Sequence, residues 1–150
     1  MAITPATEPT TSTAEVIAGR LRISATRLAR RLRQEAQTGL SPSQLSALTA
    51  VERHGPVTLG ALADHERVAP PTITRVVAKL EEADLVLRQR DPDDRRITRA
   101  VITTKGRNLL SASRRRKTEW LTTRLADLDA DSRARLAEAL DVLDELTEPR

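Results

Sequence analysis

The segment between Leu40 and Gly106 constrains the fold of this chain more than any other part of its sequence. Its apolar periodicity predicts a helix, a very short strand and two further helices, followed by two strands. The two strands, at residues 85–89 and 97–102, are joined by a turn sequence that begins at Asp91 and reads Asp-Pro-Asp-Asp-Arg-Arg. We therefore expect a small helical core that runs directly into a hairpin.

That order of elements fits a winged helix-turn-helix, and the third helix of the segment has the two faces that such a unit needs. Four apolar side chains at helical spacing form the inner face: Ile73, Val76, Val77 and Leu80. The opposite face carries the polar and basic side chains of Thr72, Arg75 and Lys79, with Pro71 beside them and Thr74 on a flank. A recognition helix places such a face in the major groove of duplex DNA. An ordinary amphipathic helix would show the same pattern, so this helix alone leaves both interpretations open.

The side chains on the outward face suit different parts of a duplex. Arg75 can donate two hydrogen bonds to a guanine edge, and Thr72 or Thr74 can meet a base edge, a thymine methyl group or a phosphate. Lys79 lies one turn further along and is better placed for a phosphate. These residues are the candidates for base and backbone contacts.

The hairpin is the more specific signal. A wing of this kind can carry arginine into the minor groove, where the potential is strongly negative. We expect Asp94 to pair with Arg96 and to fix its direction. The alternative is a solvated hairpin whose aspartates only make the turn. The further candidates for DNA contacts in and below the hairpin are Arg88, Arg90 and Arg95.

Read in order, the motifs of this segment resemble those of the multiple-antibiotic-resistance regulator (MarR) family over about 70 residues. The combination of Thr-Arg in the helix with Asp-Pro-x-Asp-x-Arg before a strand that ends in Thr-x-x-Gly is specific. The matching stretches are Leu59–Ala63, Thr72–Val77, Leu80–Glu81, Leu85–Arg88, Asp91–Arg96 and Val101–Gly106.

The resemblance implies a homodimeric, cytoplasmic winged-helix transcription factor, usually a repressor that a small ligand releases from DNA. By matching positions, it implies major-groove contacts by Thr72, Thr74 and Arg75. It also implies a wing pair of Asp94 and Arg96, with Arg96 in the minor groove.

The chain departs from the family pattern at two points. Ala69 stands where a capping serine is common, and Pro71 follows Pro70 directly, so the recognition helix is expected to begin with a weaker cap. The chain also has no cysteine, which excludes the thiol-switch branch of the family.

We predict a mainly α fold with a small β-hairpin (α+β), a winged helix-turn-helix flanked by dimerisation helices. The expected parts are a disordered arm (residues 1–12), an N-terminal dimerisation helix (13–39), the DNA-binding domain (40–106) and C-terminal dimerisation helices (107–150). The flanking helices carry apolar stripes that the central domain cannot cover, and a two-fold dimer would bury them.

A small-molecule effector, aromatic or anionic, is an open possibility. Arg114 and Arg115 belong to a basic run that could form a cationic rim, although ion pairs with neighbouring helices explain the run equally well. Trp120 is expected in the core or interface, with ligand contact as the alternative. His54 and His65 lack a clustered ligand motif, so no metal and no cofactor is expected.

Other functions find less support. The charge balance of the chain, +4, is weakly basic, and residues 40–106 are nearly balanced, so folding must create any basic surface. No phosphate loop, activated nucleophile or carboxylate pair indicates an enzyme. No segment is apolar enough for a membrane span, and a cytoplasmic location is expected. The remaining alternative is a winged-helix module that binds protein and not DNA.

Overall fold

The computed structural model describes the backbone of residues 11–148 and the side chains of residues 13–148. The chain divides into two units, residues 1–36 and 37–150. The first unit is helix α1 (Thr11–Ala36). It begins inside the predicted arm, whose residues 1–10 lie outside the described part. The helix was predicted to extend to Gly39. It ends earlier, because the backbone already adopts the left-handed conformation at Gln37, with φ of 47°.

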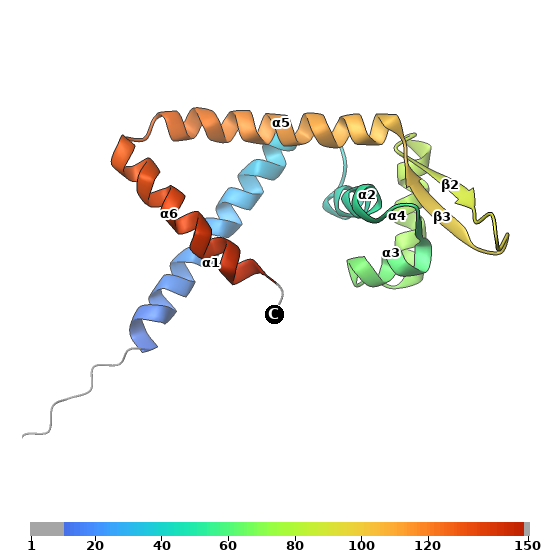
Figure 1. The fold of residues 1–150 in the computed structure, drawn as a ribbon, viewed down its shortest axis with the longest axis horizontal. Coiled ribbons are helices and arrows are strands. Elements are labelled where there is room, and N and C mark those ends of the chain that lie inside the picture. Colours follow the sequence, from blue (N-terminus) through green and yellow to red (C-terminus); the bar gives the residue numbers. More distant parts are fainter. Residues whose placement is uncertain (1–10, 149–150) are drawn as a thin grey trace, which may run out of the picture. The chain divides into compact units, whose positions relative to one another are not determined.

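The second unit contains the remaining helices and strands (Figure 1). It comprises α2 (Pro42–His54), β1 (Val57–Thr58), α3 (Leu59–Glu66), α4 (Pro70–Glu82), β2 (Val86–Arg90), β3 (Thr98–Ile102), α5 (Thr104–Ala126) and α6 (Ala130–Thr147). Helices with a small antiparallel sheet confirm the predicted α+β fold class and the winged helix-turn-helix within it.

Side-chain caps fix where the helices of this unit begin. Ser41 accepts a hydrogen bond from the Gln44 N–H, and the Gln44 side chain accepts one from the Ser41 N–H, so α2 starts with a capping box. Thr58 caps α3, and Thr103 caps α5 by accepting from the N–H of Gly106. Helix α4 has no side-chain cap at Ala69, as the sequence predicted.

The sheet places the wing beside α4. Its strand order is β1-β3-β2, and both pairings are antiparallel. Arg88 lies opposite Ala100 in the register of β2 and β3. The wing is therefore continuous with this sheet. The shortest strand, β1, connects the sheet directly to the start of α3.

Apolar side chains from every element between α2 and the start of α5 form one core. The predicted inner face of α4 is confirmed: Ile73, Val77 and Leu80 are buried, and Val76 packs against them at the edge. They meet Leu48 of α2 and further buried side chains from α3 and the sheet. This packing fixes the outward direction of the polar face of α4.

Candidate nucleic-acid interface

The outward face of α4 carries the polar side chains that the sequence singled out. Pro71, Thr72, Thr74, Arg75 and Lys79 are all exposed. The hydroxyl of Thr74 donates to the Pro70 carbonyl oxygen at 2.9 Å, so in this conformation it serves the helix backbone. The exposed basic side chains that remain toward the solvent are Arg75 and Lys79.

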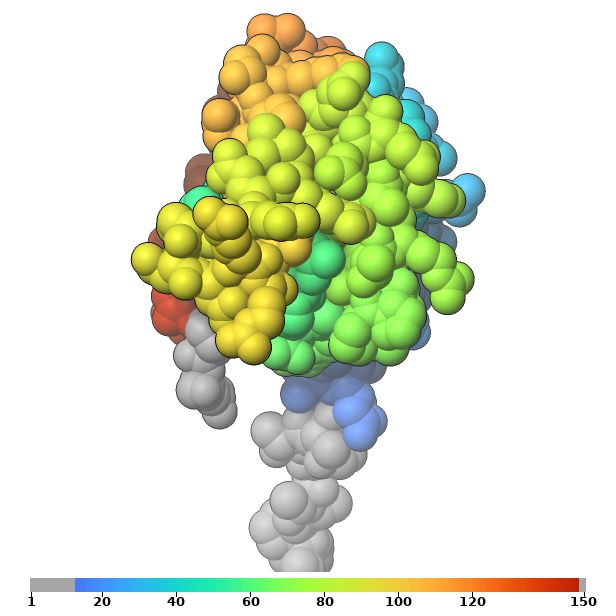
Figure 2. Space-filling view, turned by 90° about the vertical axis from the view of Figure 1, so that its right-hand side faces the viewer, coloured from blue at the N-terminus to red at the C-terminus, as the bar shows by residue number. Residues whose placement is uncertain are grey.

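The wing and α4 lie next to each other on one face of this unit (Figure 2, hairpin in yellow, α4 in yellow-green). At its tip Asp94 accepts hydrogen bonds from the backbone N–H of Arg96 at 3.0 Å and from its side-chain Nε at 3.3 Å. The Arg96 side chain is 92% exposed, while Arg90 and Arg95 are exposed beside it. The structure thus brings together the expected wing pair and leaves its arginine facing solvent.

The sequence did not indicate a second pair, which lies where the wing loop joins the two strands. The Asp91 carboxylate accepts hydrogen bonds from the backbone N–H of Asp93 and Asp94 and from Nε of Arg99, the last at 2.6 Å. Asp91 is only 7% exposed. An aspartate that opens a turn and is followed by proline is a known signal for such side-chain-to-backbone bonding, so part of this arrangement was detectable.

These bonds lower the pKa of Asp91 below its ordinary value, first through Arg99 and then through the backbone N–H groups. A lowered carboxyl pKa adds stability above the unfolded-state pKa of about 4, and the contribution disappears as the pH falls through the lower folded-state pKa. We therefore expect the wing backbone to lose order as the pH falls below about 4 and passes through the lowered pKa of Asp91. Backbone ¹⁵N relaxation of residues 91–97 would measure this loss.

The matched control for this pH effect is Asp91→Asn, which cannot titrate at that position. Its wing should show no step in order over the same pH range while the α2 amides stay ordered. A wild-type wing that keeps its order, or an equal step in the variant, would contradict the role assigned to the Asp91 carboxylate.

Arg88 lies differently from the other candidate residues. It is half-buried at the foot of the wing, where its Nε lies 3.2 Å from a carboxylate oxygen of Glu81 and its Nη2 donates to the Thr74 carbonyl oxygen at 3.4 Å. Both partners belong to α4. The guanidinium that the sequence placed among the DNA contacts thus has two partners within the protein.

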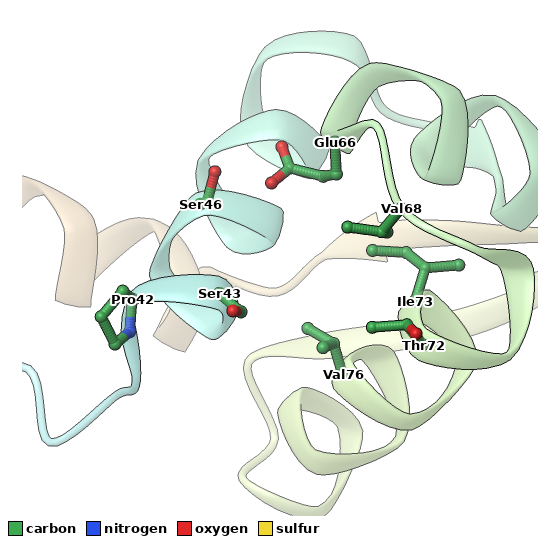
Figure 3. A pocket seen from close by; sticks show the side chains of 8 residues that line it. All are labelled: Pro42, Ser43, Ser46, Glu66, Val68, Thr72, Ile73 and Val76. Atoms are coloured by element: carbon green, nitrogen blue, oxygen red, sulfur yellow. The ribbon is translucent and has the colours of Figure 1, made fainter.

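Two hollows border α4. One is lined by Ser41, Ser43 and Gln44 of α2 together with Thr72, Arg75 and Lys79 of α4, so the polar first turn of α2 adjoins the outward face of the recognition helix. The other lies between α2, the end of α3 and α4, and its lining includes Pro42 and Ser43 of the first turn of α2 (Figure 3). There Glu66 lies on the side of Ser46, and Thr72 and Val76 form the opposite wall.

The candidate ligand residues on α5 do not form a single site. Arg114 forms a bidentate ion pair with Glu52 of α2, in which its two Nη atoms donate to the carboxylate oxygens at 2.7 and 3.1 Å. This hydrogen bonding lowers the pKa of Glu52. Arg115 pairs with Glu119 one turn along α5. Both arginines border a shallow hollow along this helix, whereas Trp120 is not in its lining and has the Arg124 guanidinium 5.6 Å from its ring centre.

The two histidines do come together, with parallel rings 4.3 Å apart. Among the described residues, however, no group of three or more side chains of the kinds that bind metals is found. In the same part of the chain, no helix is long and apolar enough to cross a membrane.

Comparison with known proteins identifies the group to which this arrangement belongs. The sequence profile of the MarR family matches residues 40–98, from the end of the first connection into the wing. An uncharacterised HTH-type transcriptional regulator from Mycobacterium leprae is 43% identical over 131 residues, which cover 87% of this chain and 92% of that protein. The chain belongs to the MarR family.

Solved structures agree with this assignment. A transcriptional regulator from Pseudomonas aeruginosa, so described, superposes with a TM-score of 0.83 at 36% identity and covers 95% of this chain and 100% of its own. A MepR variant from Staphylococcus aureus, solved bound to an oligodeoxyribonucleotide, shares the fold with a TM-score of 0.71 at 21% identity over 87% of this chain and 98% of its own. This MarR-family chain is a DNA-binding transcriptional regulator and not an enzyme.

Proposed function

We propose that this MarR-family protein is a homodimeric repressor that reads a palindromic promoter site in the cytoplasm. The observation that carries the proposal is that α4 and the wing lie next to each other on one face. Arg75 is exposed on α4, and Arg96 is exposed on the wing. In this proposal Thr72, Thr74 and Arg75 contact bases in the major groove, with Pro71 against the same groove wall. Arg96, held by Asp94, enters the minor groove. Lys79, Arg90 and Arg95 neutralise phosphates.

The dimer follows from apolar surface that a single copy leaves exposed. Helix α6 has no buried residue, and its side chains Leu140, Val142 and Leu146 are more than half exposed. Val16 and Ile17 of α1 are equally open to solvent. Exposed apolar side chains of this kind mark an interface on each helix, and a second copy of the chain would cover them. Two-fold symmetry would then set two recognition helices about 34 Å apart, which demands a palindrome.

A small aromatic or anionic ligand would release the repressor from DNA. The hollow along α5 supports this part of the proposal, because Arg115 borders it and is held, among the described residues, only by an exposed pair with Glu119. Arg114 borders the same hollow but is held by Glu52, so an anion would have to compete with that carboxylate. Trp120 contributes to such a site only if the helix surface rearranges on binding.

The test is selection of bound sequences from a random duplex pool by the full-length chain, combined with the mass of the complex. The expected result is an inverted repeat whose half-sites lie about one helical turn apart and a complex with two copies of the chain. Recovery of no preferred sequence, with no salt-sensitive complex on any duplex, would instead favour a winged-helix module that binds protein.

A further inference from the structure

Arg88 is a basic candidate at the interface whose guanidinium contacts protein groups of another element, helix α4. Its Nε is enclosed by protein atoms and lies 3.2 Å from the Glu81 carboxylate, although the two are not aligned for a hydrogen bond. Its Nη2 reaches the Thr74 carbonyl oxygen at 3.4 Å. The Arg88 side chain is 30% exposed. These contacts tie strand β2 to the recognition helix at two points.

The two partners of Arg88 share one face of α4. Thr74 and Glu81 are seven residues apart, which is about two helical turns. The Glu81 side chain leans toward the N-terminus of the helix, as helical side chains do, so it approaches the guanidinium that also reaches Thr74. A carbonyl oxygen has a second lone pair, so Thr74 can accept from Arg88 in addition to its helical partner. We call the contacts of Arg88 with Glu81 and Thr74 the clamp. It spans about two turns of the helix that carries Arg75.

The covalent connection between α4 and β2 is short and also fixed. The N–H of Leu85 donates to the Leu80 carbonyl oxygen and the N–H of Asp84 to that of Glu81, each at 2.9 Å, with Asp84 in the left-handed region at φ 59°. This is the hydrogen-bond pattern of a Schellman helix ending. The connection sets where the strand leaves the helix, and Arg88, three residues after Leu85, contacts α4 again.

We infer that Arg88 is a positioning residue, held by Glu81, that fixes the recognition helix relative to the wing and does not itself contact DNA. The inference rests on the proposed DNA-reading face, since it concerns how that face is held. It assigns to an acidic residue, Glu81, a favourable part in binding a polyanion. That sign is opposite to what its charge alone would give.

The sharpest test compares Glu81→Gln with Glu82→Gln. Both remove one negative charge from the end of α4. Of these two glutamates, Glu81 is the one that pairs with Arg88. Loss of charge repulsion should leave Glu82→Gln binding as well as the wild type or better. Glu81→Gln should bind the selected operator roughly two- to fivefold more weakly, the range of a partly exposed ion pair, with less change on random duplex. Equal strengthening by both variants would overturn the inference.

Arg88→Gln separates positioning from phosphate contact. A positioning role predicts weaker operator binding with the same dependence on salt as the wild type, whereas a lost phosphate contact lowers the salt slope by about one. The Arg88→Gln/Glu81→Gln double variant should bind as the weaker single variant does, because both changes break the same pair. A lowered slope for Arg88→Gln, or fully additive losses, would overturn the inference.

A readout without DNA keeps this test separate from the proposed function. Hydrogen exchange of the free protein should show at least a twofold loss of protection in β2 for Glu81→Gln and Arg88→Gln, and none for Glu82→Gln. If the chain selects no DNA sequence, the proposed function fails. The exchange data still test whether Arg88 and Glu81 hold β2 against α4. Unchanged protection in all three variants would refute it.

Discussion

Arg75→Ala is expected to reduce binding to the selected operator by about 1–3 kcal/mol while binding to random duplex changes much less. Arg75 is exposed on the second turn of α4, and the buried side chains Ile73 and Val77 on either side of it fix its outward direction. A guanidinium held in this way can meet both acceptors of a guanine edge, which alanine cannot replace. Competition binding with operator and random duplex at one salt concentration measures the difference.

Lys79→Ala is the matched control for Arg75→Ala. Lys79 lies one turn further along the same exposed face, and its replacement by alanine also removes one positive charge. As a phosphate contact it should weaken all sequences alike and lower the salt slope by about one. If Arg75→Ala reduced binding to operator and random duplex equally, Arg75 would be a backbone contact and sequence reading would have to lie elsewhere on α4 or in the wing.

Local sequence signals predicted the two faces of the recognition helix. The spacing of Ile73, Val77 and Leu80 sets a face by itself, because helical geometry relates nearby residues without reference to the rest of the fold. Caps also act over three residues, as Ser41, Thr58 and Thr103 do at the starts of α2, α3 and α5. The Asp94–Arg96 pair is also local, two residues apart at the wing tip.

The pairs that hold the interface together could not be predicted in the same way. Arg88 reaches back to Glu81 and Thr74, and Arg114 reaches Glu52 across 62 positions of sequence. Such contacts depend on strand register and on how helices pack, and a charge pattern alone leaves many partners equally possible. For this reason the sequence indicated neither the contacts of Arg88 with α4 nor the Asp91–Arg99 pair.

The Thr-x-x-Gly sequence that ends the wing has a physical explanation that leads to the second large effect. Thr103 donates its N–H to the Leu85 carbonyl oxygen at 3.0 Å and its hydroxyl to the Asp84 carbonyl oxygen at 2.7 Å, and it accepts from the N–H of Gly106. These bonds draw the first turn of α5 against the backbone that connects α4 to β2. Gly106 is buried at that contact.

Gly106→Ala should therefore destabilise the protein by about 1–3 kcal/mol or more, the usual cost of overfilling a packed site. An added Cβ would overlap the Leu85 carbonyl oxygen and lie 2.8 Å from Cγ1 of Ile102. The Leu85 carbonyl is backbone and is held by Thr103, so it cannot move aside without breaking that bond. Urea unfolding followed by far-ultraviolet circular dichroism gives the change in the free energy of unfolding.

Gly60→Ala provides the control, because a Cβ at Gly60 meets nothing within 4 Å. Alanine also has the higher helix propensity, so this variant should be as stable as the wild type or slightly more so. A large loss at position 106 and none at position 60 would show that the close approach of α5 to Leu85, and not the glycine backbone as such, requires the small residue. Equal unfolding midpoints for the two variants would mean that α5 can shift away from the strand at little cost. The wing would then be held chiefly by the Asp91–Arg99 and Arg88–Glu81 pairs.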